Sequence, residues 1–175
     1  MEAAEKTIKI FAVDDDKKHL LVLEDSLTKN LPYQIEVENY ESGEAVLNAL
    51  SKDPDIVILD YYFDSEDKNS ATGIEVLKRI KSKRPELPVV MMSHQDNIEV
   101  AVQCYDYGAK DYVVKNETAY ARAQIIVRNV IHEILKEQQI QKYKASVKTA
   151  YYVLGIFIVF LLAVIVYLAF ELSNI

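Results

Sequence analysis

The sequence predicts an α/β fold in which helices cover both faces of a parallel sheet, with an extended last helix that leads into a single transmembrane helix. Strand-like and helix-like patterns alternate through residues 1–115, as in a parallel sheet with helical connections. Three of the strand-like runs are almost entirely apolar, as expected for strands buried on both faces. Between Thr149 and Phe170 the chain contains no Asp, Glu, Lys or Arg, which is typical of a membrane span.

Each predicted strand is a short run rich in valine, isoleucine and aromatic residues. The five runs are Ile8–Val13, Ile35–Tyr40, Asp55–Leu59, Pro88–Met92 and Asp111–Val114. The first, third and fourth are the nearly all-apolar runs. Because a helical segment separates each run from the next, we expect the strands to lie parallel to one another in one sheet.

The predicted helices repeat apolar residues at helical spacing, as at Leu20, Leu23 and Leu27. They span Lys17–Lys29, Gly43–Leu50, Gly73–Lys83, Asn97–Tyr107 and a long segment from Glu117. Residues that typically cap helix N-termini precede three of them, namely Asp16, Ser42 and Asp96. The Tyr61–Thr72 connection is polar, acidic and long for its place, so it is either a functional loop or a surface insertion.

The last helix contains no Gly or Pro over residues 117–148, so we expect it to continue with little interruption into the span. The Ala150–Phe170 run has 21 residues. At about 1.5 Å of rise per residue this gives roughly 31 Å, close to the hydrocarbon thickness of a bilayer. Before it, Ile140, Tyr143 and Val147 form a short apolar stripe, which belongs either to a dimer helix or to a solvated spacer.

Lysines gather on the N-terminal side of the apolar run, whereas Glu171–Ile175 contains no Lys or Arg. These lysines are Lys136, Lys142, Lys144 and Lys148. The positive-inside rule then predicts a cytoplasmic domain anchored by one pass through the inner membrane, and the lysines suit anionic lipid. The start of the chain does not resemble a secretory signal peptide. We expect a domain over residues 1–130, a helical juxtamembrane stalk over 131–148, a transmembrane helix over 149–171 and a short external tail over 172–175.

Composition excludes several classes of function. The formal charge of −7 argues against general nucleic-acid binding, which needs a basic face. A single cysteine, Cys104, excludes an intramolecular disulfide and a cysteine-rich metal site. Of the 175 residues, those outside the apolar run suffice for one domain, so we expect no fused DNA-binding or kinase domain.

Polar side chains stand at the carboxyl ends of four predicted strands: Asp14, Asp15, Asp60, Ser93 and Lys115. Parallel strands point these ends at one edge of the sheet, so we expect the side chains to converge there. Clustered carboxylates repel one another, and a hard divalent cation such as Mg²⁺ resolves the conflict. Cation, lysine and hydroxyl can then hold a phosphoryl group, which a carboxylate accepts as an aspartyl phosphate. Taken singly, the same residues are also typical of helix caps, a turn and a solvated lysine.

Five segments carry a family resemblance: IFAVDDDKKHL, DIVILD, TGIEVLKRIK, PVVMMS and AVQCYDYGAKDYVVK. Over about residues 7–130 the chain resembles the receiver domain of bacterial two-component response regulators. The resemblance implies a flavodoxin-like fold with five parallel strands in the order 2-1-3-4-5. It also implies that a histidine kinase or a phosphotransfer protein donates a phosphoryl group to the domain. The domain is then a phosphoacceptor that promotes its own phosphotransfer rather than an enzyme.

The resemblance further implies a phosphoacceptor and a Mg²⁺ site. Asp60 matches the phosphoacceptor and is also a metal ligand. Asp14 and Asp15 match the acidic pair, in which Asp15 binds the metal directly and Asp14 acts on it indirectly. The backbone carbonyl of Tyr62, two residues after Asp60, matches the third protein ligand of the metal.

The remaining matched residues belong to the phosphoryl pocket and the switch of the family. Lys115 matches the lysine that contacts the phosphoryl group, Ser93 matches the switch hydroxyl, and Tyr112 matches the switch aromatic residue. On phosphorylation, Ser93 and Tyr112 are expected to shift inward and to remodel the face made by the fourth helix, the fifth strand and the fifth helix.

Three positions depart from the family pattern. Gly73 comes thirteen residues after Asp60 and no Pro precedes it, whereas the family usually has a Pro-containing connection of about eight residues. His94 follows the switch hydroxyl, where a small residue is usual. Asn116 follows the lysine, where a Pro is usual, and is expected to cap the next helix.

The sequence therefore favours a membrane-anchored, stand-alone receiver that signals through contacts with an unknown downstream protein. Its other expected partners are the phosphodonor protein, membrane lipid and a second copy of the chain, without nucleic acid. One alternative is a membrane-tethered scaffold that keeps the receiver fold and works without phosphorylation. A minor alternative is a phosphatase that resembles the haloacid dehalogenases, with Asp14 and Asp16 as its Asp-x-Asp motif. That alternative is disfavoured because Lys18 stands where the motif needs Thr or Val, and because Asp60 has no role in it.

Overall fold

A computed structural model of the chain describes residues 6–63, 72–94 and 96–173. For residues 162–164 and 166–173 it describes the backbone only. The chain divides into two compact units, Met1–Ile131 and His132–Ile175. Helix α5 (Ala119–Ser173) contributes to both units, as the predicted long helix requires.

The first unit is built on a parallel sheet whose strands follow the order β2-β1-β3-β4-β5 in the described part of the chain. The strands are β1 (Ile8–Val13), β2 (Ile35–Tyr40), β3 (Ile56–Asp60), β4 (Val89–Ser93) and β5 (Asp111–Val114). This confirms the predicted sheet and its strand order. The third and fourth strands lie one residue later than predicted, because Asp60 pairs with Met92 and Ser93 pairs with Val114 in the ladder.

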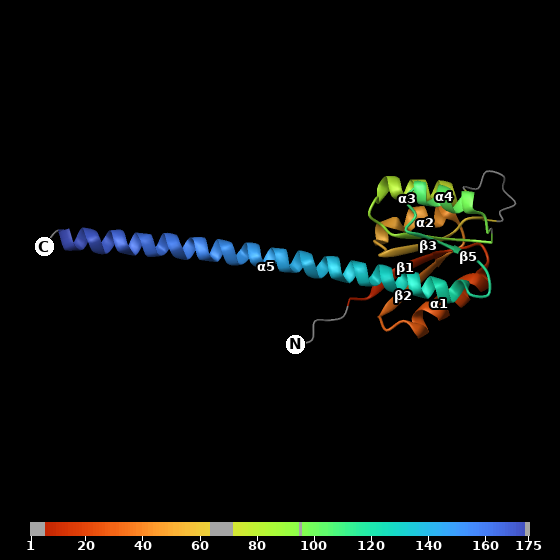
Figure 1. Ribbon diagram of the computed structural model, residues 1–175, viewed down its shortest axis with the longest axis horizontal. Helices are drawn as coiled ribbons and strands as arrows, with labels where there is room; N and C mark the ends of the chain where they lie inside the picture. Colours follow the sequence, from red (N-terminus) through yellow and green to blue (C-terminus); the bar gives the residue numbers. More distant parts are fainter. Residues whose placement is uncertain (1–5, 64–71, 95, 174–175) are drawn as a thin grey trace. The chain divides into compact units, whose positions relative to one another are not determined.

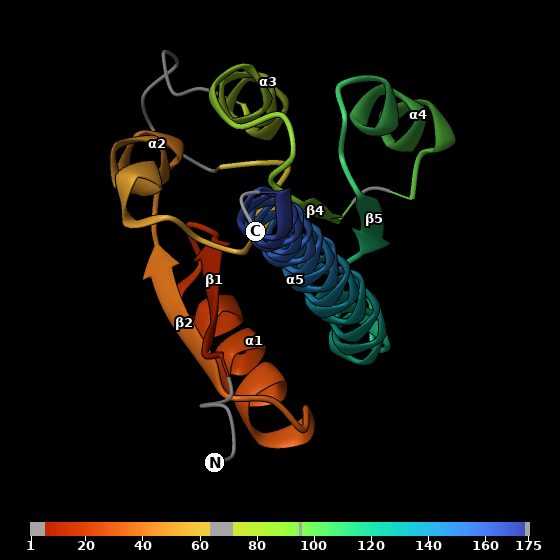
Figure 2. The same ribbon diagram turned by 90° about the vertical axis from the view of Figure 1, so that its left-hand side faces the viewer.

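Helices cover both faces of this sheet (Figure 1). The helices before α5 are α1 (Lys17–Asn30), α2 (Gly43–Ala49), α3 (Gly73–Lys83) and α4 (Ile98–Asp106), and a short 3₁₀ turn, η1 (Leu50–Lys52), follows α2. Figure 2 shows α2, α3 and α4 on one side of the strands, with α1 and the first turns of α5 on the other. Ligands bind at the carboxyl ends of the strands in such folds.

Capping explains where most of the helices begin. Asp16 accepts a hydrogen bond from the backbone N–H of Lys18 at 2.8 Å, which confirms the predicted cap of α1. Ser42 caps α2 in the same way, through the N–H of Ala45. The prediction of Asp96 as the cap of α4 was wrong, because the side chain of its neighbour Asn97 accepts from the N–H two residues ahead.

Helix α5 begins at Ala119 rather than at Glu117. Asn116 accepts hydrogen bonds from the backbone N–H and the hydroxyl of Thr118, at 3.0 and 2.9 Å. The N–H of Ala119 then donates to the carbonyl of Asn116. Asn116 therefore does cap the segment, but a turn separates it from the first helical residue.

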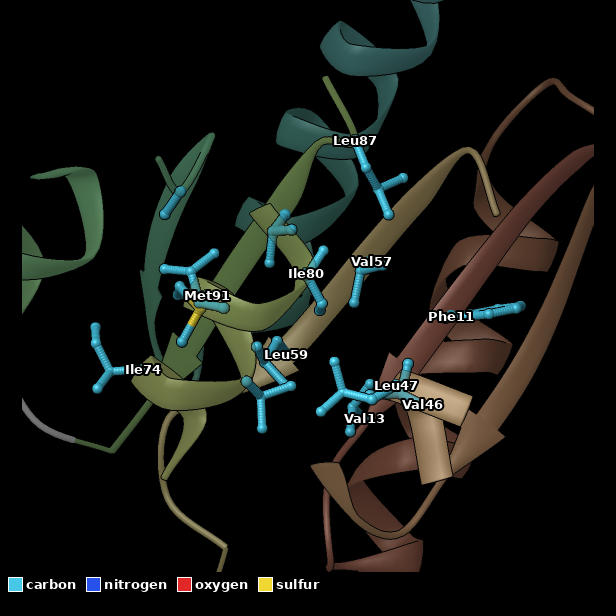
Figure 3. Close-up of a cluster of buried hydrophobic side chains, with 14 of the residues drawn as sticks. Phe11, Val13, Val46, Leu47, Val57, Leu59, Ile74, Ile80, Leu87 and Met91 are labelled. Atoms are coloured by element: carbon cyan, nitrogen blue, oxygen red, sulfur yellow. The ribbon is translucent and has the colours of Figure 1, made fainter. Parts of the chain in front are cut away.

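The hydrophobic core that supports the site lies between the sheet and helices α2, α3 and α4 (Figure 3). Strand side chains such as Phe11, Val57 and Leu59 meet helix side chains such as Val46 and Ile80, and all of these are completely buried. Burial of such side chains contributes about 1.5–3 kcal/mol each before entropy is counted. The core therefore gives the strand ends a rigid base.

The second unit is the remainder of α5. Its described side chains from Gln139 to Leu161 are almost all exposed, including Ile156 and Val159 within the apolar run. Among the described residues, one helix is long and apolar enough to cross a membrane, as judged from length and composition alone. The end of the predicted transmembrane helix and the predicted external tail lie outside the described side chains.

Candidate functional site

The structure brings the polar residues of four strand ends to one edge of the sheet. Asp14 directly follows β1, Asp60 and Ser93 are the last residues of β3 and β4, and Lys115 directly follows β5. Backbone hydrogen bonds continue the ladder past the strands, because the N–H of Lys115 donates to the carbonyl of Ser93 at 2.7 Å. The register of the sheet thus places residues that are far apart in sequence beside one another.

A buried ion-pair network forms the centre of this site. The Lys115 Nζ lies 2.6 Å from Asp14 Oδ2 and 2.9 Å from Asp60 Oδ1. The three side chains are exposed by only 10% or less. Backbone groups complete the network, since the N–H of Asp16 donates to Asp14 Oδ1 and the N–H of Tyr61 donates to Asp60 Oδ1. Each buried charge is therefore paired and hydrogen-bonded, as burial requires.

Burial and pairing shift the two charges of the network in different ways. Burial raises the pKa of Asp60, and the neighbouring charge of Lys115 only partly opposes this rise. Burial by itself would lower the pKa of Lys115, but the charge of Asp60 and the hydrogen bonds to Asp14 and Asp60 outweigh it and raise that pKa. Lys115 is thus held as a cation, whereas the Asp60 carboxylate is less stable than it would be in water.

Three carboxylates lie close enough to share one metal ion. Asp14, Asp15 and Asp60 each offer an oxygen, and these oxygens lie within 4.8 Å of one another. Asp15 is more exposed than the other two. A donor set made only of oxygen atoms fits a hard divalent cation such as Mg²⁺. Tyr62, whose carbonyl was predicted as a further ligand, follows the last residue of β3 by two positions at the same edge.

Ser93 and Tyr112 lie on the neighbouring strands β4 and β5. Ser93 is completely buried, Tyr112 is almost completely buried, and their side chains are hydrogen-bonded to each other. Burial raises the pKa of the Tyr112 phenol, and the hydrogen bond to Ser93 acts in the opposite direction. An inward shift of Tyr112 was expected only after phosphorylation, but the described chain already holds the ring inside.

Two histidines, His19 and His94, lie at the edge of the acidic site. The His19 Nδ1 lies 3.6 Å from Asp14 Oδ2, and its Nε2 lies 3.8 Å from Asp16 Oδ2. Within the described residues this buried Nδ1 has no hydrogen-bond partner. The His19 ring is 5.5 Å from that of His94, the residue after Ser93. His94 was noticed from the sequence and His19 was not, although its place one turn after Asp16 on the same helix face could have revealed it.

The long connection after Asp60 returns to the strand it leaves. Residues 64–71 of the predicted Tyr61–Thr72 loop lie outside the described residues, but the N–H of Gly73 donates to the carbonyl of Tyr61 at 3.0 Å. A Cβ atom on Gly73 would press against the backbone carbonyl of Asp60 and lie 2.7 Å from the Cα of Tyr61. Thr72 and Glu75 form a capping box at the start of α3. The two ends of the long connection are therefore held together by the hydrogen bond between Gly73 and Tyr61, directly beside Asp60.

Comparisons with known proteins agree with this geometry. The family described as the response regulator receiver domain matches residues 10–127. The DNA-binding transcriptional regulator NtrC of Klebsiella pneumoniae is 34% identical over 128 residues, which cover 73% of this chain and 25% of that protein. NtrC of Escherichia coli K12 is 33% identical over 131 residues, or 74% of this chain and 26% of that protein. The chain thus corresponds to about a quarter of the length of these relatives.

Solved structures show the same fold. The BeF₃-activated receiver domain of DrrB, a response regulator of Thermotoga maritima, superposes with a TM-score of 0.63 at 26% identity and covers 73% of this chain and 99% of that domain. NtrX of Brucella abortus superposes with a TM-score of 0.66 at 26% identity, covering 78% of this chain and 30% of NtrX. With the family match over most of its first unit, the chain belongs to the response regulator receiver domain family of two-component signalling.

Proposed function

We propose that this chain is a membrane-anchored receiver in which Asp60 accepts a phosphoryl group from the phosphohistidine of a histidine kinase or phosphotransfer protein. The single observation that carries the proposal is the buried Asp60 carboxylate, which lies 2.9 Å from the Lys115 ammonium and beside two further carboxylates at the open edge of the sheet. Family membership supports the reaction class, since receivers are phosphoacceptor signalling domains.

The chemistry follows from the groups around Asp60. An oxygen of its carboxylate attacks the phosphorus of the phosphohistidine, the P–N bond breaks, and its electron pair returns to the imidazole. The product is an acyl phosphate on Asp60. Lys115, held as a cation, pairs with one oxygen of the transferred group, and the Ser93 hydroxyl donates to another. Asp15, Asp60 and the Tyr62 carbonyl would hold a Mg²⁺ ion, with Asp14 acting indirectly, and the bound ion would supply positive charge that offsets the incoming phosphoryl group.

Ser93 and Tyr112 then carry the signal to the surface. When the Ser93 hydroxyl turns toward the phosphoryl oxygen, its hydrogen bond to Tyr112 changes, and Tyr112 packs within the core beside α4. Such a switch is a shift in population between two packings. A downstream protein reads the surface that results.

The anchor is the second part of the proposal. Residues 1–130 form the receiver, 131–148 a helical stalk and 149–171 a transmembrane helix, with the receiver on the cytoplasmic side of the inner membrane. Support comes from the uncharged run from Thr149 to Phe170 and from the exposed apolar side chains that α5 carries there.

The decisive experiment incubates the full chain in detergent with Mg²⁺ and radiolabelled acetyl phosphate. We expect acid-stable but hydroxylamine-sensitive label on the wild type and none on Asp60→Ala. Asp25→Ala is the matched control, because Asp25 is an exposed carboxylate on α1 that pairs with Lys29 outside the site. Equal labelling of wild type and Asp60→Ala, or no labelling of either by acetyl phosphate or a phosphorylated kinase, contradicts the proposal.

A phosphorylation-independent scaffold is the second candidate. The observation that favours it is the pair of imidazole rings, His19 and His94, beside the acidic site, where the family usually has a small residue after the switch hydroxyl. Cells that carry Asp60→Ala separate the two functions. Full signalling by this variant supports the scaffold, and loss of signalling supports the phosphoacceptor.

A further inference from the structure

The first unit of the chain is strongly acidic, whereas the second, with four lysines and three glutamates, contains one stretch of uncompensated lysines. Residues 1–131 contain 16 Lys and Arg against 24 Asp and Glu, so the first unit is strongly acidic. By contrast, residues 138–170 contain three lysines and no acidic side chain. These are Lys142, Lys144 and Lys148. The positive charge of the second unit is therefore concentrated directly before its apolar run and is not neutralised along the helix.

The helical spacing arranges this segment into two neighbouring stripes. Lys144, Lys148 and Tyr152 follow one another at intervals of four residues, and Tyr143, Val147 and Tyr151 do the same one position earlier. An open groove runs between them, lined by these six side chains. The three tyrosines are 71%, 72% and 65% exposed at positions 143, 151 and 152. Ammonium groups and phenol rings thus share one face of the helix, which we name the lysine–tyrosine collar.

The chemistry of the collar determines which partner fits it. Lysine places a compact positive charge at the end of an apolar stem, and tyrosine combines an apolar ring with a polar tip. Both are suited to the layer where phospholipid headgroups meet hydrocarbon. Directly after the collar come the apolar side chains of Val153, Leu154 and Ile156, each more than half exposed. The ligand must therefore present negative charge and hydrocarbon together, as an anionic phospholipid does and as nucleic acid or an acidic protein surface does not.

We propose that the lysine–tyrosine collar of α5 binds the headgroups of anionic phospholipids and selects them over zwitterionic ones. This inference rests on the membrane anchorage proposed above. The lysines pair with headgroup phosphates through charge, and the tyrosine rings lie against the glycerol and upper acyl region. The attraction is worth about fivefold in association per lysine near the surface, which corresponds to about 1 kcal/mol each, and salt weakens it.

The test reconstitutes the full chain into vesicles of phosphatidylcholine alone and of phosphatidylcholine mixed with phosphatidylglycerol. Flotation measures anchorage, and the enrichment of spin-labelled phosphatidylglycerol over spin-labelled phosphatidylcholine around the protein measures selection. We expect the wild type to float with both vesicles and to enrich phosphatidylglycerol. Replacement of Lys142, Lys144 and Lys148 by Gln is expected to abolish the enrichment while flotation remains, and replacement of all three by Arg is expected to preserve it.

The matched control replaces Lys17, Lys29 and Lys83 by Gln, because these exposed lysines of the first unit give the same change in net charge. We expect this variant to keep the enrichment. Flotation without enrichment by the wild type, or enrichment that survives replacement of Lys142, Lys144 and Lys148 by Gln, overturns the inference and leaves the anchor intact. If the wild-type chain floats with neither kind of vesicle, both the membrane anchor and the inference are overturned. Enrichment that high salt does not reduce also overturns it, because the attraction would then not be electrostatic.

Discussion

The two units use lysine in opposite ways. Lys115 is buried in the first unit and lies between Asp14 and Asp60, whereas Lys144 and its neighbours stand exposed on the second. The two buried carboxylates depend on the cation that they share, because removal of Lys115 would leave both of them uncompensated in a medium of low dielectric. An exposed charge is hydrated and screened, so it adds to its neighbours almost independently.

This difference indicates which substitutions change the folding stability of the first unit and which change only the binding of lipid by the second. Changes in the buried network alter the free energy of unfolding and the chemistry of Asp60 together, since the same contacts hold both. Changes in the lysine–tyrosine collar leave the fold of the first unit as it is. Four substitutions test the contrast, beginning with the largest expected effect.

Lys115→Met is expected to destabilise the first unit by about 3–5 kcal/mol, because it leaves the buried carboxylates of Asp14 and Asp60 facing each other without a cation. Urea unfolding of the full chain in detergent, followed by near-ultraviolet circular dichroism, measures the change. Lys142→Met is the control on the second unit and is expected to leave the midpoint unchanged. Equal urea midpoints for Lys115→Met and Lys142→Met would contradict the claim that the buried lysine stabilises the fold and the exposed one does not.

Gly73→Ala is expected to destabilise by about 1–3 kcal/mol and to slow labelling of Asp60, because the added Cβ would press on the backbone of Asp60 and Tyr61. The same unfolding and labelling assays measure both effects. Gly155→Ala on the second unit is the matched control, since no described atom lies within 4 Å of its Cβ position. Wild-type labelling by Gly73→Ala would show that the base of the connection does not position the phosphoacceptor.

Asp60→Asn is expected to raise the free energy of unfolding at neutral pH, by less than Gly73→Ala lowers it. The raised pKa of Asp60 means that the folded chain holds its proton more tightly than the unfolded chain does. The ionised carboxylate therefore lowers stability above the folded pKa, and this penalty disappears as the pH falls through that pKa toward the ordinary value of 3.8. Unfolding of wild type and variant across this acidic range should show their difference shrinking, and a difference that grows toward acid contradicts the prediction.

His94→Ala is expected to have the smallest effect, a several-fold faster labelling of Asp60 by acetyl phosphate with little change in stability. The ring of His94 lies 5.5 Å from that of His19 at the edge of the site, so its removal widens access for a small phosphodonor. Initial rates of labelling measure the change. His132→Ala, at the start of the second unit, is the control, and equal rates for the two variants would exclude a steric role for His94.

Much of the fold could be predicted from local pattern. Strand runs such as Ile8–Val13 and Asp111–Val114 were located to the residue, because apolar β-branched runs between helical segments have few other arrangements. Boundaries were less certain where several candidates stood together. Asp96 and Asn97 are both good caps, and only the path of the backbone decided that Asn97 accepts the hydrogen bond. The strand order was expected from family resemblance and not from periodicity.

The sequence predicted which residues form the site, but not which of them contact one another. Asp14, Asp60 and Lys115 follow from the rule that parallel strands end at one edge. Their pairing does not, because it depends on ladder register and on side-chain burial. For the same reason the contact of His19 with Asp14, and the inward position of Tyr112 against Ser93, were found only in the structure.

The amino-acid sequence by itself determined the alternation of strands and helices, the uncharged run of α5 and the kinds of charged group at the strand ends. These depend on local periodicity and composition, which a single chain displays directly. Only the tertiary structure decided that Lys115 is shared between two carboxylates, one of them 101 positions away, and that Gly73 closes on the strand of Asp60. Such contacts arise when distant segments pack against one core, and no local pattern records the distances that packing sets.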